Sequence, residues 1–273
     1  MLSISSDIII NPELSPADTD GLSALAGTLL RGEIPTGAEL VYDGRNRLYV
    51  HTLPSGRKVN IKAFRRGGAL KKLIYGRLRF DKGRHSYDNA RRLLALGFDT
   101  PQPLMTCSAR SAGRWFLERA FYVCAQEDAV RQTRCWEEWP DRDALVEALG
   151  QEMGRLFRAG VLFRDFSPGN VLLRTGTPAG EYRFVYVDVN RTDFGVRSRR
   201  RLMSMFRRIN IVEAETSRLA RALARDMGWD PEATRLRALG VLRRFLWLKD
   251  DVQKPLKRLI RPGNPKYRRS ATK

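Results

Sequence analysis

The stretch Val161-Leu-Phe-Arg-Asp-Phe-Ser-Pro-Gly-Asn-Val-Leu-Leu173 carries the sharpest pattern in this chain of 273 residues. Gly160, directly before it, is a helix stop signal. An apolar approach leads into an Arg-Asp pair, a Pro-Gly turn follows, and Asn170 opens a second apolar run. A loop this tight brings the side chains of Asp165 and Asn170 to one side of the turn.

The spacing of these two residues matches the protein-kinase catalytic loop, in which His-Arg-Asp is followed by Asn five residues after the Asp. We predict that Asp165 accepts or orients the proton of an attacking hydroxyl, beside Arg164, and that Asn170 offers its amide oxygen to Mg²⁺. Phe163 stands where protein kinases have His, and we expect it to fill the same packing role. The alternative interpretation is a surface turn capped by Asp and Asn.

A second pattern is the apolar run Phe184-Val-Tyr-Val-Asp-Val-Asn190, which we expect to be a strand that delivers Asp188 as the second Mg²⁺ ligand. The residues Asp193-Phe194-Gly195 compete for this role, since they spell the kinase Asp-Phe-Gly motif literally. Asp188 is favoured because it emerges directly from the apolar strand, whereas Asp193 follows a polar segment.

The stretch Val59-Asn-Ile-Lys62 matches the kinase Val-Ala-Ile-Lys strand, whose Lys reaches the α- and β-phosphates of ATP. Alternation along a strand puts Lys62 on one face and Val59 and Ile61 on the other. By itself Lys62 reads as an exposed strand lysine. Its place upstream of a helix and a further strand, in kinase order, favours the phosphate-binding role.

Two further parts of an ATP site are less sharply marked. The nucleotide-covering loop of protein kinases has three glycines, whereas here Gly44 is followed by Arg45 and Asn46, which we expect to help hold the phosphates. Asp88 is the best candidate for the helix carboxylate that pairs with Lys62. An ordinary solvated helix aspartate is the alternative for Asp88.

The rest of the chain fits an α+β, bilobal protein-kinase-like fold, with an antiparallel-sheet N-lobe and a mainly helical C-lobe. Alternating and apolar runs predict strands within 38–64 and 115–126, and helical periodicity predicts helices at 86–96, 141–159 and through most of 200–248. We predict an ATP-binding lobe at 1–126, a catalytic lobe at 127–253 and a basic, frayed tail at 254–273.

Composition restricts the partners. Lys and Arg total 50 against 30 Asp and Glu, and residues 191–273 alone hold 23 basic and 8 acidic residues. Such an excess favours an anionic partner, namely nucleic acid, a phosphorylated glycan or an acidic membrane surface, although these arginines also read as solvated helix faces. Three cysteines without CxxC pairing, no signal peptide and no long apolar run predict a cytoplasmic protein without a membrane span.

The motifs together resemble the lipopolysaccharide kinase (Kdo/WaaP-like, InaA-type) family, in its Bacteroidetes-type form. The pieces that carry this resemblance are Tyr42-Asp-Gly-Arg-Asn46, Val59-Asn-Ile-Lys62, Ser86-Tyr-Asp88 with Gly97-Phe-Asp-Thr-Pro-Gln-Pro103, Arg164-Asp-Phe-Ser-Pro-Gly-Asn170 and Val187-Asp-Val-Asn-Arg191.

The resemblance implies a bilobal kinase, ATP and Mg²⁺ as cofactors, and a sugar hydroxyl of the lipopolysaccharide core/Kdo region as acceptor, at the cytoplasmic face of the inner membrane. The basic last third agrees with an anionic glycolipid substrate and with peripheral binding to that membrane, since each basic residue near an anionic surface contributes about 1 kcal/mol.

Two other functions remain open. An atypical protein Ser/Thr kinase would have the same fold, but no Ala-Pro-Glu motif follows Asp188. A non-catalytic kinase-like scaffold that binds nucleic acid would explain the charge. It would not explain why Lys62, Asp165, Asn170 and Asp188 occur together, and no nucleic-acid-binding motif is present, so nucleic acid is not the expected partner.

Overall fold

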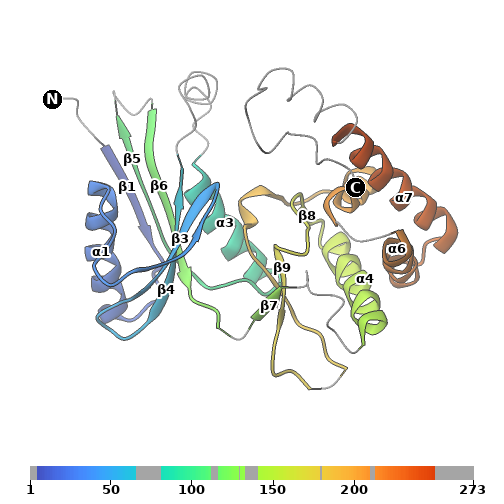
Figure 1. Ribbon diagram of the computed structural model, residues 1–273, viewed down its shortest axis with the longest axis horizontal. Coiled ribbons are helices and arrows are strands. Elements are labelled where there is room, and N and C mark those ends of the chain that lie inside the picture. Colours follow the sequence, from blue (N-terminus) through green and yellow to red (C-terminus); the bar gives the residue numbers. More distant parts are fainter. Residues whose placement is uncertain are drawn as a thin grey trace, which may run out of the picture. The chain divides into compact units, whose positions relative to one another are not determined.

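The computed structural model describes residues 5–65, 81–111, 116–128, 130–132, 141–178, 180–209 and 213–249 (Figure 1). The chain divides into two compact units, one of residues 1–131 and 171–192 and one of residues 132–170 and 193–273. The predicted tail at 254–273 lies outside the described residues. The predicted change of lobe at residue 126 differs from this division, because residues 171–192 belong to the first unit.

The first unit is built on an antiparallel six-stranded sheet in the order β1-β5-β6-β4-β3-β2. Its strands are β1 (Ser5–Ile10), β2 (Glu39–Asp43), β3 (Asn46–Thr52), β4 (Lys58–Phe64), β5 (Pro103–Ser111) and β6 (Phe116–Ala125). The strands expected within 38–64 and 115–126 are confirmed, and β6 is central. The sequence does not predict β5, since Pro101 and Pro103 indicate a turn there. Proline is tolerated as the first residue of a strand.

Two helices cover opposite faces of this sheet, α1 (Pro16–Arg31) and α3 (Lys82–Ala95) (Figure 1). Ser15 caps α1 with its side chain, and Pro16 follows at the first helical position, where its missing N–H costs no hydrogen bond. This helix is not among those predicted from the sequence. Asp81 caps α3 by accepting from the N–H groups of Gly83 and Arg84.

The core of this unit lies between α1 and the sheet. Leu22, Leu25 and Leu29 pack there against strand residues that point to the same face, among them Val59, Ile61, Met105, Cys107 and Val123. The other face, which carries Lys62, lies toward α3. Alternation along β4 therefore separates packing residues from chemistry residues, as the sequence predicts.

The hairpin of β9 (Val171–Arg174) and β10 (Phe184–Tyr186) also belongs to the first unit and forms a small sheet with β7 (Val130–Gln132). Arg174 binds it in place through ion pairs to Asp99 and Glu127. The N–H of Tyr186 donates to the carbonyl of Asp99. These bonds explain why the hairpin is joined to the sheet-rich unit rather than to the helices that surround it in sequence.

The second unit is mainly helical, as predicted. Its elements are α4 (Arg142–Arg158), β8 (Leu162–Phe163), α5 (Arg199–Leu202), the 3₁₀ helix η3 (Met203–Arg208), α6 (Glu213–Met227) and α7 (Pro231–Trp247); the 3₁₀ helix η2 (Val189–Arg191) and the short β11 (Thr192–Asp193) lead into it. Helices α4 and α6 approach closely at Gly150, where an added Cβ would lie 2.5 Å from the Cβ of Ala222.

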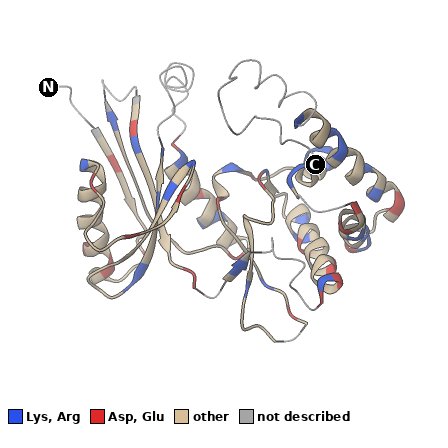
Figure 2. Ribbon diagram, in the orientation of Figure 1, with Lys and Arg blue, Asp and Glu red and all other residues tan. Residues whose placement is uncertain are grey.

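Basic residues recur along α7 and on the segments before it (Figure 2). Within the part of the chain that the structure describes, no helix is both long and apolar enough to cross a membrane. Cys107 and Cys124 are buried and free, and burial raises the pKa of each thiol to about 12, which agrees with their expected packing role.

Candidate active site

Lys62 lies in the middle of β4, opposite Leu48 of β3 and Tyr122 of β6. Its ammonium Nζ is 2.5 Å from Oδ1 of Asp188, and only 13% of its side-chain surface is exposed. The interpretation of Lys62 as an exposed strand lysine is therefore wrong. Burying part of a charged lysine costs free energy of desolvation, and the ion pair with the Asp188 carboxylate offsets that cost.

Asp188 lies just beyond β10, and its backbone is left-handed, with φ 57° and ψ 42°. Among the described residues it is the one non-glycine with positive φ. Aspartate tolerates this region better than most residues, and such conformations cluster at functional sites. The turn directs its carboxylate to Lys62, which is distant in sequence.

Hydrogen bonds hold the backbone on both sides of Asp188. The hydroxyl of Thr100 donates to the carbonyl of Tyr186 at 2.6 Å. The side-chain amide of Asn89, on α3, donates to the carbonyl of Val189 at 2.8 Å. The position of the carboxylate is thus fixed from the sheet side and from α3.

Asp193, the competing aspartate, has a different environment within the second unit. One of its oxygens, Oδ2, accepts from both Arg164 and Arg201 at 2.6 and 2.9 Å. A carboxylate shared by two guanidinium groups is a poor candidate for a metal ligand, because its charge is already compensated. The preference for Asp188 stays a prediction, and this geometry supports it. Arg164 is thereby placed as a partner of Asp193.

Lys82 lies within electrostatic reach of Asp188 and of three other cations. The pKa of Lys82, in the first turn of α3, is lowered chiefly by desolvation and then by the positive charge of Arg45, with smaller effects of Arg191 and Lys62, while Asp188 opposes the shift. A group of cations that act on one another near a carboxylate favours a polyanion such as a triphosphate. Sequence reasoning missed Lys82 and Arg191, although Arg191 closes the Val-Asp-Val-Asn-Arg motif itself.

The prediction that Asp88 pairs with Lys62 requires correction. Asp88 lies on α3, but its carboxylate accepts from Arg84 at 2.7 Å, one helical turn earlier, and 49% of its side-chain surface is exposed. Asp88 is therefore an ordinary solvent-exposed helix aspartate, the alternative considered from the sequence. The next residue, Asn89, makes the contact between α3 and the Asp188 segment.

The turn between β2 and β3 consists of Gly44 and Arg45, while Asn46 is the first residue of β3, opposite Phe64. The N–H of Gly44 donates to the carbonyl of Asn46. A Cβ at Gly44 would meet the outer end of the exposed Tyr42 ring. Of the three predicted phosphate-binding residues, Arg45 acts electrostatically on the Lys82 cluster.

The loop that contains Asp165 and Asn170 is closed by two hydrogen bonds within the second unit. The side-chain amide N–H of Asn170 donates to the carbonyl of Asp165 at 3.0 Å, and its backbone N–H donates to Ser167. The amide nitrogen of Asn170 is used in this way, and the amide oxygen is the atom that a metal ion would bind. Asp165 is only 5% exposed.

Phe163 takes the packing role expected of it. It is buried and meets the ring of Phe166 edge-on, with centroids 6.3 Å apart. The two packed rings thus anchor the chain directly before Arg164 and directly after Asp165. The N–H of Phe166 donates to the carbonyl of Phe163 and tightens this turn.

The site offers oxygen atoms of the kind that bind magnesium. Carboxylate and amide oxygens are the ligands that Mg²⁺ prefers, and it retains water and phosphate oxygens for its other positions. Asp188 in the first unit and Asn170 in the second each offer an oxygen of this kind. Among the described residues there is no cluster of three or more His, Cys, Asp or Glu side chains suited to a metal.

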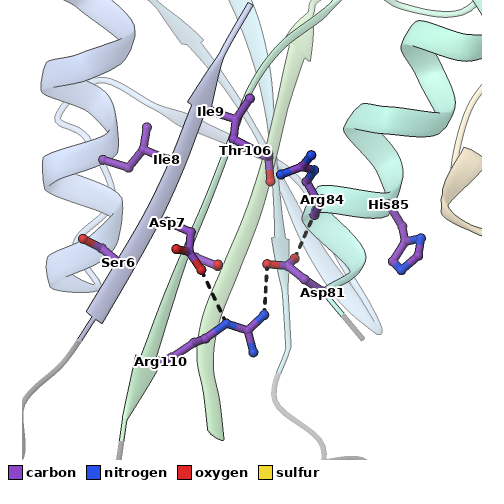
Figure 3. A pocket seen from close by; sticks show the side chains of 10 residues that line it. Ser6, Asp7, Ile8, Ile9, Asp81, Arg84, His85, Thr106 and Arg110 are labelled. Atoms are coloured by element: carbon purple, nitrogen blue, oxygen red, sulfur yellow. Dashed lines mark hydrogen bonds and ion pairs between the residues drawn. The ribbon is translucent and has the colours of Figure 1, made fainter. Parts of the chain in front are cut away.

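A cavity of about 570 Å³ elsewhere in the first unit lies between β1, β5 and α3 (Figure 3). Arg110 spans it, with ion pairs to Asp7 and Asp81 at 3.6 and 3.8 Å. Its lining includes neither Lys62 nor Asp188. The contacts of Arg110 join the N-terminal strand to the cap of α3, a structural role.

The sequence of residues 37–223 matches the model of the lipopolysaccharide kinase (Kdo/WaaP) family. The chain belongs to this family. The resemblance drawn from the motifs is therefore confirmed, as is the prediction of an enzyme that transfers phosphate to an alcohol group. Comparison with curated protein sequences gives no match.

Two solved structures show the fold of this lipopolysaccharide kinase family member. WaaP in complex with acyl carrier protein has a TM-score of 0.56 and 18% identity, covering 90% of this chain and 99% of that chain. The Rio2 kinase of Chaetomium thermophilum, in its ADP/Mg²⁺-phosphoaspartate complex, has a TM-score of 0.50 and 15% identity, covering 93% and 80%. The predicted protein-kinase-like fold is confirmed, and kinase membership implies use of a nucleotide.

Proposed function

We propose that this lipopolysaccharide kinase transfers the γ-phosphoryl group of ATP to a sugar hydroxyl of the lipopolysaccharide core/Kdo region. The observation that carries the proposal is the Lys62–Asp188 pair at 2.5 Å, in a chain that belongs to this family. In this proposal Lys62 would bind the phosphates of ATP. Arg45, Lys82 and Arg191 would add positive charge around them.

Asp188 and Asn170 are the residues we propose as magnesium ligands. Bound Mg²⁺ would neutralise charge that develops on the phosphates. Phosphoryl transfer passes through a loose transition state, so the protein mainly positions groups and stabilises charge. The hydrogen bonds around Asp188 and Asn170 serve that need, because they fix both side chains before substrate arrives.

Asp165 is the residue we propose to meet the acceptor. Its buried carboxylate would accept the proton of the sugar hydroxyl while the hydroxyl oxygen forms a bond to the γ-phosphorus. The bond from that phosphorus to the bridging oxygen breaks, and ADP leaves with the electron pair. The proton thus goes to Asp165, and the electron pair of the broken bond goes to ADP.

We further propose that the enzyme works at the cytoplasmic face of the inner membrane, as a peripheral protein. Support comes from the net charge of +20 and from its concentration in the last third of the chain. Anionic lipids and phosphorylated core sugars would both attract such a surface.

The test is transfer of label from γ-labelled ATP, with Mg²⁺, to purified core glycolipid or to delipidated cell protein. Label in the glycolipid is expected. Label in protein alone would contradict the proposal and favour a protein kinase. Mass spectrometry of lipopolysaccharide from a deletion strain should show the loss of one phosphate group.

Asp165→Asn should lower kcat for the glycolipid by about 10²- to 10⁴-fold, since it removes the proton acceptor but keeps the shape of the side chain. Asp20→Asn, an exposed position on α1, is the matched control and should leave kcat unchanged. Unaltered transfer by Asp165→Asn would exclude Asp165 as the base.

A further inference from the structure

The buried carboxylate of Asp165 has a guanidinium partner from a distant part of the second unit. Nη1 of Arg208, the last residue of η3, lies 3.2 Å from Oδ1 of Asp165. The two residues differ in accessibility, since 7% of the Asp165 side-chain surface is exposed against 45% for Arg208. The guanidinium thus connects the proposed base with solvent.

Arg208 is also held from its other side. Its guanidinium carbon is 5.9 Å from the ring centroid of Phe245, on α7, which is within reach of a cation–π contact. Arg208 uses one N–H group on Asp165 and lies against the ring of Phe245. The guanidinium has five N–H groups, so others are available for a third partner. A planar guanidinium with free donors suits a carboxylate or a phosphate.

The neighbouring arginines have structural partners instead. Arg164 and Arg201 share Asp193, and Arg199 lies 3.8 Å from the ring of Trp229 and donates to the hydroxyl of Thr234. The segment 197–208 contains six arginines and no acidic residue. An anion that approaches Asp165 from solvent would therefore enter a positive field, and Arg208 contacts the proposed base there.

We propose that Arg208 binds an anionic group of the acceptor, a carboxylate or phosphate on the sugar that is phosphorylated or on its neighbour. It thereby decides which hydroxyl reaches Asp165. The inference rests on the proposed function. Arg208 takes no part in the transfer itself, because the hydroxyl proton still goes to Asp165 and ADP still leaves from the γ-phosphorus.

The experiment compares wild type, Arg208→Gln and Arg208→Lys on three acceptors: intact core oligosaccharide, the same material after carboxyl reduction, and the same material after dephosphorylation. ATP hydrolysis without acceptor is measured beside them. Arg207→Gln, the exposed neighbour in η3, is the matched control.

Arg208→Gln should raise KM for the intact acceptor by about 10- to 100-fold, which is the weight of one charge-assisted hydrogen bond. Its KM for the neutralised acceptor should equal that of wild type, and acceptor-free ATP hydrolysis should persist. The KM of Arg208→Lys for the intact acceptor should lie between those of wild type and Arg208→Gln, since lysine keeps the charge but not the planar guanidinium. If wild type has the higher KM for the carboxyl-reduced acceptor, the anionic group is a carboxylate. If it has the higher KM for the dephosphorylated acceptor, the group is a phosphate.

Three results would overturn the inference. The first is that wild type phosphorylates all three acceptors with equal kcat/KM. The second is that Arg208→Gln lowers kcat equally on all three acceptors with KM unchanged, which is the behaviour of a residue that only positions Asp165. The third is that Arg207→Gln has the same effect as Arg208→Gln, which is the behaviour of general surface charge. Failure of wild type to phosphorylate any of the acceptors would instead refute the proposed function.

Discussion

Asp188 combines two properties that are rarely found together, a left-handed backbone and an ion pair across more than a hundred residues of sequence. The backbone conformation costs free energy, which aspartate and asparagine bear better than other non-glycine residues. The residue type is therefore constrained by its conformation as well as by the charge that Lys62 and a metal need.

Substitution separates these constraints. Asp188→Asn keeps a side chain that tolerates positive φ but removes the charge, so we expect kcat to fall by at least about 10²-fold and Lys62 to lose the carboxylate that offsets its desolvation. Asp188→Ala should lose activity as well, and its free energy of unfolding should be lower than that of Asp188→Asn by about 1 kcal/mol, through backbone strain. Steady-state kinetics over a Mg²⁺ titration and thermal unfolding measure the two effects.

Asp193→Asn is the comparison that decides between the two aspartates. It removes the partner of Arg164 and Arg201 but no proposed metal ligand, so most activity and the Mg²⁺ dependence should remain. If Asp193→Asn abolished the Mg²⁺ dependence while Asp188→Asn kept it, the assignment would have to be reversed.

At the scale of elements, α3 reaches the Asp188 segment through an amide. Asn89 donates to the carbonyls of Val189 and Thr192, at 2.8 and 3.4 Å, while Asp88 stays with Arg84 on the exposed side of the helix. The helix therefore acts on the position of Asp188 through the backbone of η2 rather than on Lys62 through a carboxylate.

This difference gives opposite expectations for two adjacent residues. Asn89→Ala should lower kcat by about 10-fold, since losing a partly buried hydrogen bond that fixes the turn costs about 1 to 2 kcal/mol. Asp88→Ala should change kcat by less than about 2-fold, as expected for loss of an exposed ion pair.

Both variants are measured with ATP and glycolipid under the same conditions, with circular dichroism to verify folding. A large loss of kcat in Asp88→Ala, with Asn89→Ala unaffected, would restore Asp88 as the partner of Lys62.

At the scale of the whole molecule, charge is the dominant feature. The net charge of +20 destabilises the folded chain through self-repulsion, a cost that an anionic partner would relieve. Many arginines of the second unit are paired with acidic residues, as in Arg243 with Glu213 and Arg221 with Glu232. The excess nevertheless remains, because basic residues outnumber acidic ones.

We expect the protein to co-sediment with vesicles of anionic phospholipid and not with zwitterionic vesicles. Raising the ionic strength from about 0.05 M to about 0.5 M should release it, because screening shortens the Debye length below the size of the contact. Arg197→Glu with Arg200→Glu should weaken binding more than the control pair Lys58→Glu with Arg92→Glu, in the first unit. Binding that is equal on both lipids would exclude this electrostatic mechanism.

The sequence by itself determined the fold class, the family and the order of the main chemical groups. Local rules suffice for these features: alternation places Lys62 opposite Val59 and Ile61, and the five-residue spacing of Asp165 and Asn170 defines one tight loop. Strands β2, β3, β4 and β6 follow from the same periodicity, whereas α1 is not predicted, and the prolines at positions 101 and 103 indicate a turn where β5 begins.

Only the tertiary structure decided which groups meet across long distances in sequence. The 2.5 Å pair of Lys62 with Asp188, the use of Asn89 in place of Asp88, and the contact of Arg208 with Asp165 each join segments at least forty residues apart. A helix periodicity shows that Asp88 and Asn89 lie on α3, but their partners depend on which face of the helix the packing buries. That choice is made by the sheet and the hairpin together, not by the local sequence.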